Sequence, residues 1–196
     1  MKYQWIILAL ALAGGLIASL VVNQRDNANF EPDYPISLLE TKDKAVDLYN
    51  ANDPRIRVIY FGYTHCPDVC PTSLAVLSAA LQQIEPEQLA RLWPIFITLD
   101  PERDTAEKSA EYAQYFHPSI IGMTGTKKQT KALAEKYGVL YMKTELKDSA
   151  LDYAVDHSSY FYFLAPDGTL VKKVQHTLNP NMLVDAINTV LETPAS

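Results

Sequence analysis

The chain has 196 residues, of which 48% are hydrophobic and 20% are charged, and its formal net charge at pH 7 is −6. This length and composition suit one N-terminal hydrophobic segment followed by a single globular domain, and they exclude a repeat array, a disordered chain and a polytopic membrane protein. The acidic charge also argues against nucleic acid as a partner.

A hydrophobic segment opens the chain: residues 5–22 read WIILALALAGGLIASLVV and contain no charge. As a helix with a rise of about 1.5 Å per residue this segment spans about 27 Å, just enough to cross a bilayer. A cleaved signal peptide is the alternative, but its apolar region usually has about 7 to 15 residues and is followed by a small-x-small cleavage site. We therefore predict a retained transmembrane anchor. Lys2 and the amino terminus ahead of the segment, against Arg25 after it, favour an orientation with the domain outside the cytoplasm. The expected location is a bacterial-type inner membrane with the domain facing the periplasm.

A polar stretch follows at residues 23–35, NQRDNANFEPDYP, with two prolines and no periodicity. This composition is typical of a linker. The folded domain is therefore expected to cover 36–196 and to lie close to the membrane surface.

Two nearly continuous apolar runs, at 56–62 (IRVIYFG) and 94–99 (PIFITL), have the pattern of parallel strands covered on both faces. The segment between them, from Pro71 to Ile84, predicts a helix. Pro71 suits a first helical position, and Leu74, Leu77 and Leu81 share one face with Ile84. The three segments form a strand, helix, strand unit.

Three more helices and a strand pair are expected further along the chain. We predict helices over 105–116, over 127–137 and from Pro180 onward, and strands over 159–164 and 170–174 joined by Pro166-Asp167-Gly168. Asp104, Thr126 and Asn179 are the expected N-caps, and Gly138 is the expected end of the second helix. This order predicts an α/β, thioredoxin-like domain with a central mixed sheet flanked by helices.

The two cysteines of the chain, Cys66 and Cys70, form a C-x-x-x-C motif after the first core strand and at the entrance to its helix. The partial positive charge of a helix N-terminus stabilises thiolates. Helical geometry would place the two Cα atoms about 6 Å apart, within the range that a disulfide bridges. The same sulfurs can hold one metal ion. The pair is therefore interpreted as a redox or metal site, with two inert buried thiols as the alternative.

His157 is the candidate partner of the two cysteines. Oxidoreductases of the thioredoxin type use C-x-x-C and usually a cis-proline before the hairpin strand. Here residues 147–158 contain no proline and carry His157 instead. The topology brings the start of the hairpin strand beside the end of the first core strand, so His157 can face the pair. Two thiolates and one imidazole suit copper, whereas structural zinc would want a fourth ligand. A hydrogen-bonded loop histidine is the alternative.

Two neighbouring features are less specific. His65 adjoins Cys66, and we interpret it as a group beside the site or an exposed bystander rather than a ligand. The run Asp100-Pro101-Glu102-Arg103-Asp104 follows the second core strand. Its simplest interpretation is a turn with an aspartate cap and an arginine paired to a carboxylate; a docking surface on the cysteine side of the sheet is the alternative.

Four motifs in the chain resemble those of the Sco/SenC family, the membrane-anchored copper proteins that assist assembly of the binuclear copper centre in subunit II of cytochrome c oxidase. They are Phe61-Gly62-Tyr63-Thr64-His65-Cys66-Pro67-Asp68-Val69-Cys70-Pro71, Asp100-Pro101-Glu102-Arg103-Asp104, Ile121-Gly122-Met123-Thr124-Gly125, and Val155-Asp156-His157-Ser158 leading to Pro166-Asp167-Gly168. The resemblance runs through most of 56–192. The stretch 30–55 matches less well because it has no glycine where relatives usually turn.

The resemblance implies that Cys66, Cys70 and His157 are the copper ligands, with Cu(I) as the bound ion and Cu(II) as a second state. It implies cytochrome c oxidase subunit II as the partner, with other periplasmic copper chaperones and thiol reductants as further candidates. The leading hypothesis is a copper metallochaperone, and the alternative is a thiol:disulfide reductase acting on the copper-site cysteines of that subunit. A thiol peroxidase is less well supported, because Thr64-His65-Cys66 is T-x-C rather than T-x-x-C.

Overall fold

The computed structural model describes residues 35–146 and 151–192. By its contacts the chain divides into two units, 1–33 and 34–196, and the described residues belong to the second. The predicted anchor at 5–22 and all but the last residue of the predicted linker lie outside the described residues. Within the described part, no helix has the length and apolar character needed to cross a bilayer.

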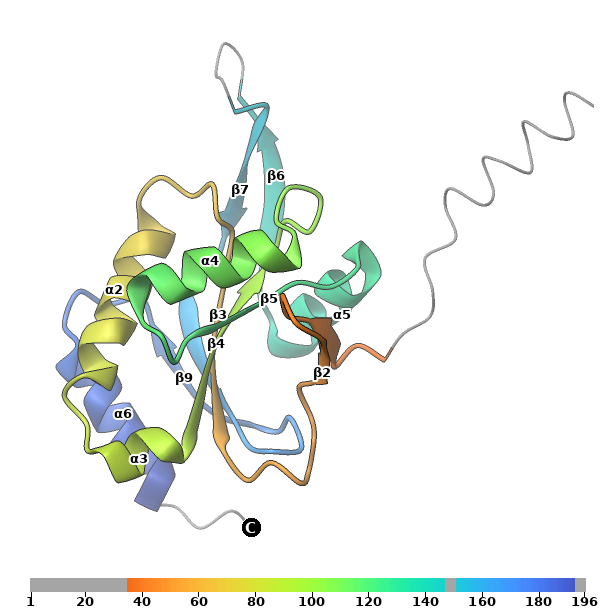
Figure 1. Ribbon diagram of the computed structural model, residues 1–196. Helices are drawn as coiled ribbons and strands as arrows, with labels where there is room; N and C mark the ends of the chain where they lie inside the picture. The colour runs from red at the N-terminus through yellow and green to blue at the C-terminus, as the bar shows by residue number, and fades with distance from the viewer. Residues whose placement is uncertain (1–34, 147–150, 193–196) are drawn as a thin grey trace, which may run out of the picture. The chain divides into compact units, whose positions relative to one another are not determined.

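A five-stranded mixed sheet in the order β5-β4-β3-β8-β9 forms the centre of the domain (Figure 1). Its strands are β3 (Ile56–Gly62), β4 (Leu92–Thr98), β5 (Ile121–Met123), β8 (Tyr160–Leu164) and β9 (Leu170–Gln175). β3, β4 and β5 run parallel, whereas β8 is antiparallel to both β3 and β9. β3 and β4 are buried along nearly their whole length, which explains their continuous apolar sequences.

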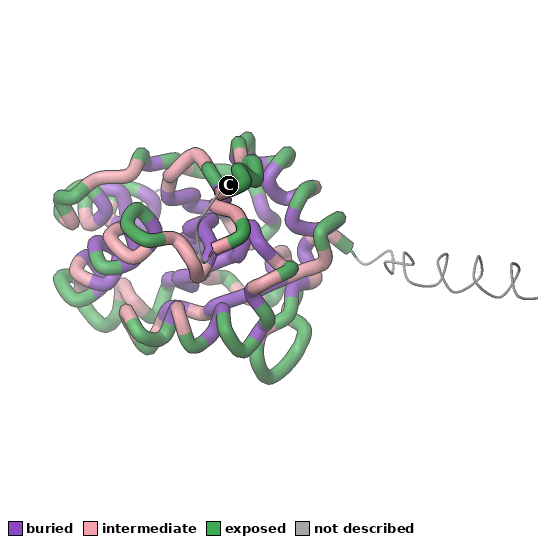
Figure 2. The backbone as a smooth tube through the Cα atoms, turned by 90° about the horizontal axis from the view of Figure 1, so that it is seen from above, coloured by how far each residue is buried: buried purple, intermediate pink, exposed green. Residues whose placement is uncertain are grey.

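Helices cover both faces of this sheet, so the expected α/β class with a central mixed sheet is confirmed. They are α2 (Val69–Leu81), α3 (Pro86–Ala90), α4 (Ala106–Phe116), α5 (Lys127–Tyr137) and α6 (Asn181–Glu192). Phe96 of β4 stacks on Tyr112 of α4 with ring centroids 5.2 Å apart, on one face. On the other face Phe61 of β3 stacks on Tyr137 of α5 at 6.4 Å. Figure 2 shows the buried segments gathered between these layers.

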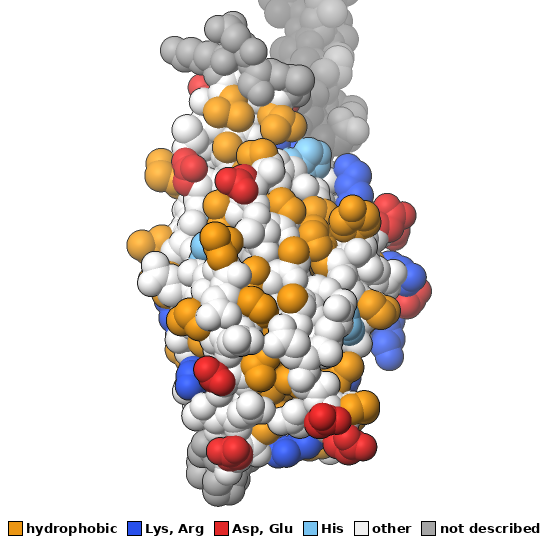
Figure 3. All heavy atoms as spheres, turned by 90° about the vertical axis from the view of Figure 1, so that its left-hand side faces the viewer, with side chains coloured by type: hydrophobic (Ala, Val, Ile, Leu, Met, Phe, Trp, Pro, Cys, Tyr) orange, Lys and Arg blue, Asp and Glu red, His pale blue; other side chains and the backbone are white. Residues whose placement is uncertain are grey.

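The outer surface on the side of α2, α3 and α6 is of mixed character. Figure 3 shows hydrophobic side chains spread over this face among uncharged atoms, while charged side chains of both signs lie mostly toward its margins. Val69, Leu178 and Met182 are among the large hydrophobic side chains that the domain exposes. Isolated exposed hydrophobic residues are normal on a protein surface and require no special explanation.

Some helix ends agree with the sequence expectations and others differ: α2 ends at Leu81 rather than Ile84, and α6 begins at Asn181 rather than Pro180. α5 begins with a capping box, in which the Thr126 hydroxyl accepts from Gln129 N, and ends at Gly138 with φ 64°. The N-cap of α4, however, is Thr105, whose hydroxyl accepts from Lys108 N. The prediction of Asp104 as that cap is wrong because other partners occupy its carboxylate. α2 begins at Val69, so Pro71 is its third residue rather than its first.

The sequence did not predict two small hairpins. The first joins β1 (Leu38–Glu40) to β2 (Ala45–Asp47) within the stretch that has no glycine. Its turn instead uses the Thr41 hydroxyl, which donates to Lys44 O at 2.9 Å and accepts from Lys44 N at 3.2 Å. A threonine side chain thus makes the turn that glycine commonly makes.

The second hairpin joins β6 (Tyr141–Glu145) to β7 (Tyr153–His157) and forms a two-stranded sheet of its own. It extends away from the central sheet at the top of Figure 1. His157 is the last residue of β7, and only two residues separate it from β8. The hairpin therefore carries His157 at the end nearest the central sheet.

Candidate metal and thiol site

The cysteines lie where β3 passes into α2. Cys66 N donates to Tyr63 O at 3.3 Å in the turn, and Cys70 lies in the first turn of the helix. Cys70 is fully buried, whereas Cys66 is half-buried. Gly62 makes this packing feasible, because a Cβ at that position would lie only 2.9 Å from Cys70 Sγ. The glycine allows the sulfur to lie directly against the end of the strand.

His157 contacts the cysteine pair, as the sequence topology predicted. Its Nε2 lies 3.3 Å from Cys70 Sγ, and Cys70 N donates to Cys66 Sγ at 3.4 Å. The other ring nitrogen, Nδ1, lies 3.2 Å from Ser158 O. If Nδ1 carries the proton and donates to this carbonyl, Nε2 presents its lone pair to the sulfurs, which is the orientation of a metal-binding histidine.

Two tyrosines frame the imidazole. The rings of Tyr60 and Tyr63 each lie 6.2 Å from the His157 ring, centroid to centroid, at 75° and 83°. These edge-to-face contacts restrict the ring's rotation. The Tyr60 hydroxyl lies 2.9 Å from Ser159 Oγ, and burial raises its pKa, so it stays protonated at neutral pH. Neither tyrosine is recognisable from the sequence as a neighbour of His157, because an apolar strand and the residue after it give no signal of what their aromatic rings contact.

The two thiols have opposite electrostatic environments. A hydrogen bond from Cys70 is the main reason that the pKa of Cys66 falls to about 3; His157 and the backbone N–H groups at the start of the helix add to the effect, while burial opposes it. The same hydrogen bond and its own burial raise the pKa of Cys70. Cys66 is therefore the thiolate at neutral pH, and Cys70 is the protonated donor behind it.

A pocket of about 270 Å³ gives access to Cys66. Cys66, Tyr63, Val155 and His157 are among the residues that line it, so both the loop of the cysteines and the β6–β7 hairpin form its walls. A larger pocket of about 390 Å³, near Trp93 and Arg55, contains no cysteine or histidine in its lining. Of these two pockets, the smaller one is therefore the one that brings a cysteine and a histidine together.

The three side chains contact one another rather than surrounding an empty centre. Within residues 35–146 and 151–192, no group of three His, Cys, Asp or Glu side chains is already disposed around a metal position. With metal–sulfur and metal–nitrogen bonds of about 2.3 and about 2.0 Å, two ligands in a trigonal site lie roughly 3.7 Å apart. The observed 3.3 Å between Cys70 Sγ and His157 Nε2 is therefore about 0.4 Å too short. The side chains must therefore move apart to bind a metal ion, and two sulfurs with one imidazole suit a soft ion such as Cu(I).

The other histidines have separate contacts. His65 Nδ1 lies 3.1 Å from Thr64 Oγ1 and 3.5 Å from Asp104 Oδ1, so it contacts the loop's polar neighbours. His117 ends α4 and accepts from Ser119 N at 3.1 Å, and burial lowers its pKa. His176 Nδ1 lies 2.8 Å from Ser73 Oγ. Of the four histidines, His157 is the one whose described contacts include a cysteine sulfur.

Comparison with known proteins places this site in a family. A sequence profile of SCO1/SenC matches residues 23–192. The chain belongs to the SCO1/SenC family. Among its SCO1/SenC relatives, the mitochondrial SCO1 homolog 1 of Arabidopsis thaliana is 40% identical over 153 residues, covering 78% of this chain and 45% of the relative. The SCO2-like protein of Rickettsia felis is 31% identical over 183 residues, covering 92% of this chain and 86% of the relative.

The fold agrees with solved SCO1/SenC structures. The crystal structure of Arabidopsis thaliana ScoI with copper bound superposes with a TM-score of 0.71 at 38% sequence identity, covering 80% of this chain and 96% of that one. The chain spans about half the length of the curated mitochondrial relatives that it matches. The similarity to SCO1/SenC members therefore covers the domain that contains the candidate site, and not those relatives as wholes.

Proposed function

We propose that this chain is a copper metallochaperone, which binds one copper ion through Cys66, Cys70 and His157 and delivers it to the binuclear copper site of cytochrome c oxidase subunit II. The observation that carries the proposal is the contact of His157 with the cysteine pair, because dithiol exchange alone does not need an imidazole there. The presence of copper in the related Arabidopsis structure supports it. Copper is the cargo of this site.

The electrostatics of the site support an order in which the three ligands bind the copper ion. The Cys66 thiolate lies at the pocket and offers the first ligand without losing a proton. Cys70 releases its proton as it binds, so loading releases protons and weakens at low pH. His157 then adds a neutral ligand. Two thiolates and Cu(I) give a net charge of −1, and ligand exchange at the half-exposed Cys66 provides the route by which the ion leaves.

Metal analysis of the reduced soluble domain tests this proposal. We expect about one Cu(I) per chain, loss of binding in Cys66→Ala/Cys70→Ala, and about 10-fold weaker binding in His157→Ala. His176→Ala is the matched control, because His176 contacts Ser73 instead of a sulfur, and it should bind copper normally. Stoichiometric copper in the double cysteine variant would overturn the assignment.

A thiol:disulfide reductase is the second candidate function, and the low pKa of Cys66 favours it. The Cys66 thiolate would attack a partner disulfide to form a mixed disulfide, and Cys70 would then release the partner's dithiol, leaving a Cys66–Cys70 disulfide. The two electrons come from this chain's dithiol, which other thiol reductants must restore. His157→Ala separates the candidates in cells that lack the natural protein. If the chain acts as a chaperone, His157→Ala fails to restore oxidase activity at low copper. If it acts as a reductase, the same variant restores it.

The proposed location is a bacterial-type inner membrane. Residues 5–22 would form a single N-terminal span, 23–35 a linker, and 36–196 a periplasmic domain that meets the oxidase subunit and other periplasmic copper chaperones. Full-length protein should stay in the membrane fraction after carbonate washing, and protease added from the periplasmic side should remove the domain. A mature chain that begins near residue 23 would identify a cleaved signal peptide instead.

A further inference from the structure

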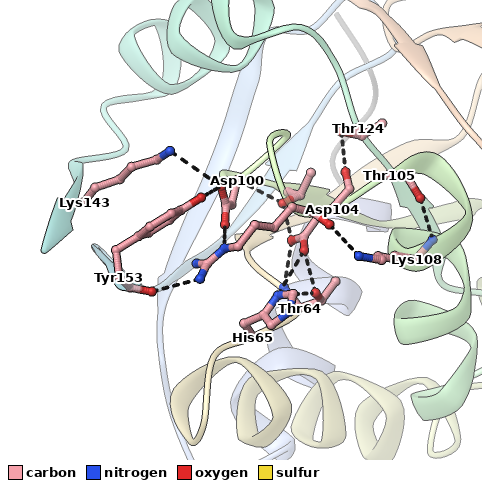
Figure 4. Close-up of polar contacts among 11 residues, drawn as sticks. Thr64, His65, Asp100, Asp104, Thr105, Lys108, Thr124, Lys143 and Tyr153 are labelled. Atoms are coloured by element: carbon pink, nitrogen blue, oxygen red, sulfur yellow. Dashed lines mark hydrogen bonds and ion pairs between the residues drawn. The ribbon is translucent and has the colours of Figure 1, made fainter. Parts of the chain in front are cut away.

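The turn at residues 100–104, between β4 and α4, contacts the cysteine loop at Thr64 and the β6–β7 hairpin at Tyr153 (Figure 4). Its two aspartates, Asp100 and Asp104, are fully buried. A buried carboxylate is costly unless hydrogen bonds or opposite charges compensate for lost hydration, so the partners of these two groups indicate what the turn does.

Asp104 holds the loop that carries Cys66. Its Oδ2 accepts from Thr64 N at 2.8 Å and from Thr98 Oγ1 at 2.6 Å, and its Oδ1 accepts from the Thr64 hydroxyl at 2.5 Å. Thr64 lies two residues before Cys66, and Thr98 is the last residue of β4. The carboxylate therefore fastens the cysteine loop to the end of a central strand.

Asp100 holds the hairpin that carries His157. The Tyr153 hydroxyl donates to Asp100 Oδ1 at 2.7 Å. Arg103 pairs with Asp100, donates from Nη1 to Tyr153 O at 2.9 Å, and places its guanidinium 3.7 Å from the centroid of the Tyr153 ring. Tyr153 is the first residue of β7 and His157 is the last. The turn therefore binds β7 at the end far from His157, through both the backbone and the side chain of Tyr153.

Lys143 of β6 adds an exposed contact to the same turn. It pairs with Glu102, lies 3.9 Å from Asp100 Oδ1, and lies 4.3 Å from the centroid of the Tyr153 ring. About two fifths of its side chain is exposed, and exposed ion pairs contribute less than about 1 kcal/mol. The buried contacts of Asp100 and Arg103 should therefore dominate the attachment of the hairpin.

The β6–β7 hairpin needs such an attachment. Its strands pair with each other and not with the five-stranded sheet, and four of the five residues of β6 are exposed. Chain connection fixes one end of β7, where Ser158 and Ser159 lead into β8. Backbone pairing does not fix the angle between the hairpin and the central sheet. Side-chain contacts must therefore set this angle, and with it the position of His157.

We propose that the 100–104 turn is a two-sided clamp that sets the distance between the cysteine pair and the imidazole of His157. Asp104 fixes the cysteine side, and Asp100 with Arg103 and Tyr153 fixes the histidine side, so these four are positioning residues for copper. The inference rests on the proposed copper site. It goes beyond that proposal by assigning a function to groups that do not contact the metal.

The decisive variant is Tyr153→Phe, which removes the hydroxyl bonded to Asp100 and keeps the ring. We expect faster amide hydrogen exchange in β6 and β7 of the copper-free protein, and about 10-fold weaker Cu(I) binding in competition with a chelator. Tyr115→Phe is the matched control, since it removes a tyrosine hydroxyl from a side chain on α4 that is 84% exposed. It should leave both measurements unchanged.

A double-mutant cycle with His157→Ala distinguishes positioning from general destabilisation. If the clamp acts through His157, Tyr153→Phe has no further effect on copper affinity once the imidazole is gone. An equal loss of affinity in both backgrounds, or no loss in either, would overturn the clamp. If Tyr153→Phe folds poorly, Arg103→Lys repeats the test, because lysine keeps the charge but cannot contact Asp100 and Tyr153 O at the same time.

The outcomes also separate this inference from the proposed function. If the intact protein binds copper through His157 and neither clamp variant changes the affinity, the clamp is wrong and the copper site stands. If His157→Ala binds copper as tightly as the intact protein, the proposed ligand set fails. The hydrogen exchange of β6 and β7 then decides whether the turn holds the hairpin at all.

Discussion

Cys70 Sγ lies 3.3 Å from His157 Nε2, although 87 residues separate the two along the chain. The antiparallel pairing of β3 with β8 brings them together, because Tyr60, near the end of β3, lies opposite Phe161, near the start of β8. The cysteine loop leaves the sheet at the same end at which the chain enters it after His157, at the start of β8. The site thus follows from the order of the strands.

The low pKa of Cys66 predicts an unusual alkylation profile. An ordinary thiol, with a pKa of about 8.5, reacts about tenfold faster with each pH unit in the range below that value. Cys66, with a pKa of about 3, should instead react with iodoacetamide at a nearly constant rate between about pH 5 and about pH 8. Mass spectrometry of the alkylated reduced protein measures this rate, and Cys70 should remain unmodified.

The lowered pKa of Cys66 also predicts how the stability of the fold depends on pH. A pKa that is lower in the folded state stabilises the fold fully above the unfolded value, about 8.5, and the contribution is lost as the pH falls toward about 3.

Cys70→Ala removes the thiol that donates to Cys66, so it should raise the pKa of Cys66 and make alkylation depend on pH. A Cys66 rate that already climbs tenfold per pH unit in the intact protein would contradict this electrostatic account.

Gly62→Ala should damage the site more than the fold. The new methyl group would lie 2.9 Å from Cys70 Sγ and about as close to the rings of Tyr60 and Phe96, so the sulfur must move. We expect a loss of about 1 to 3 kcal/mol in the free energy of unfolding, which is typical of overpacking, together with weaker Cu(I) binding.

Gly138→Ala is the control for that variant. Gly138 has φ 64° and no atom within 4 Å of the position of a Cβ, so alanine there costs about 1 kcal/mol in backbone strain without crowding any neighbour. Its copper affinity should be unchanged. Urea denaturation and chelator competition measure the two quantities, and equal copper affinities for the two variants would show that Gly62 does not protect the position of Cys70.

Local signals account for the parts of the fold that the sequence predicted. The apolar runs of β3 and β4 reflect burial on both faces, and the capping box of α5 involves residues only three positions apart. Asp104 was misassigned because the partner that takes its carboxylate, Thr64, lies 40 residues away. Sequence spacing cannot reveal such a competitor for a cap.

The same distinction applies to the candidate site. The strand order allowed His157 to face the cysteine pair but left a loop histidine as the alternative, and the resemblance to the Sco/SenC family favoured the contact that the structure has. The framing of His157 by Tyr60 and Tyr63, and the grip of the 100–104 turn on Tyr153, depend on contacts between distant segments. The β6–β7 hairpin was missed because β6 is largely exposed and neither strand has the continuous apolar pattern of β3.

Arg57 is a buried group whose hydrogen-bond partners lie in the segment just before β3. It is a fully buried charge within β3, and it donates to the carbonyl oxygens of Leu48, Asn50 and Asp53 at 2.9, 2.9 and 2.7 Å. Burial lowers the pKa of its guanidinium. Arg57→Met should cost about 3 kcal/mol or more in the free energy of unfolding, because one buried and two partly buried acceptors lose their donor at once. Arg55→Met, at a partly exposed ion pair, should cost less than about 1 kcal/mol in the same urea titration.

Thr64→Val tests the cysteine side of the 100–104 turn. Valine keeps the shape of the side chain but removes the hydroxyl that donates to Asp104 Oδ1 at 2.5 Å, which leaves a fully buried carboxylate with one donor fewer. The expected loss in the free energy of unfolding is about 1 to 3 kcal/mol. Thr144→Val is the matched control, because its hydroxyl bonds to Asp156 at an exposed position and its removal should cost less than about 0.5 kcal/mol. Since the backbone bond from Thr64 N to Asp104 remains, Cys66 should keep its fast, pH-independent alkylation. Equal losses of stability in the two threonine variants would show that the buried position of Asp104 does not depend on Thr64.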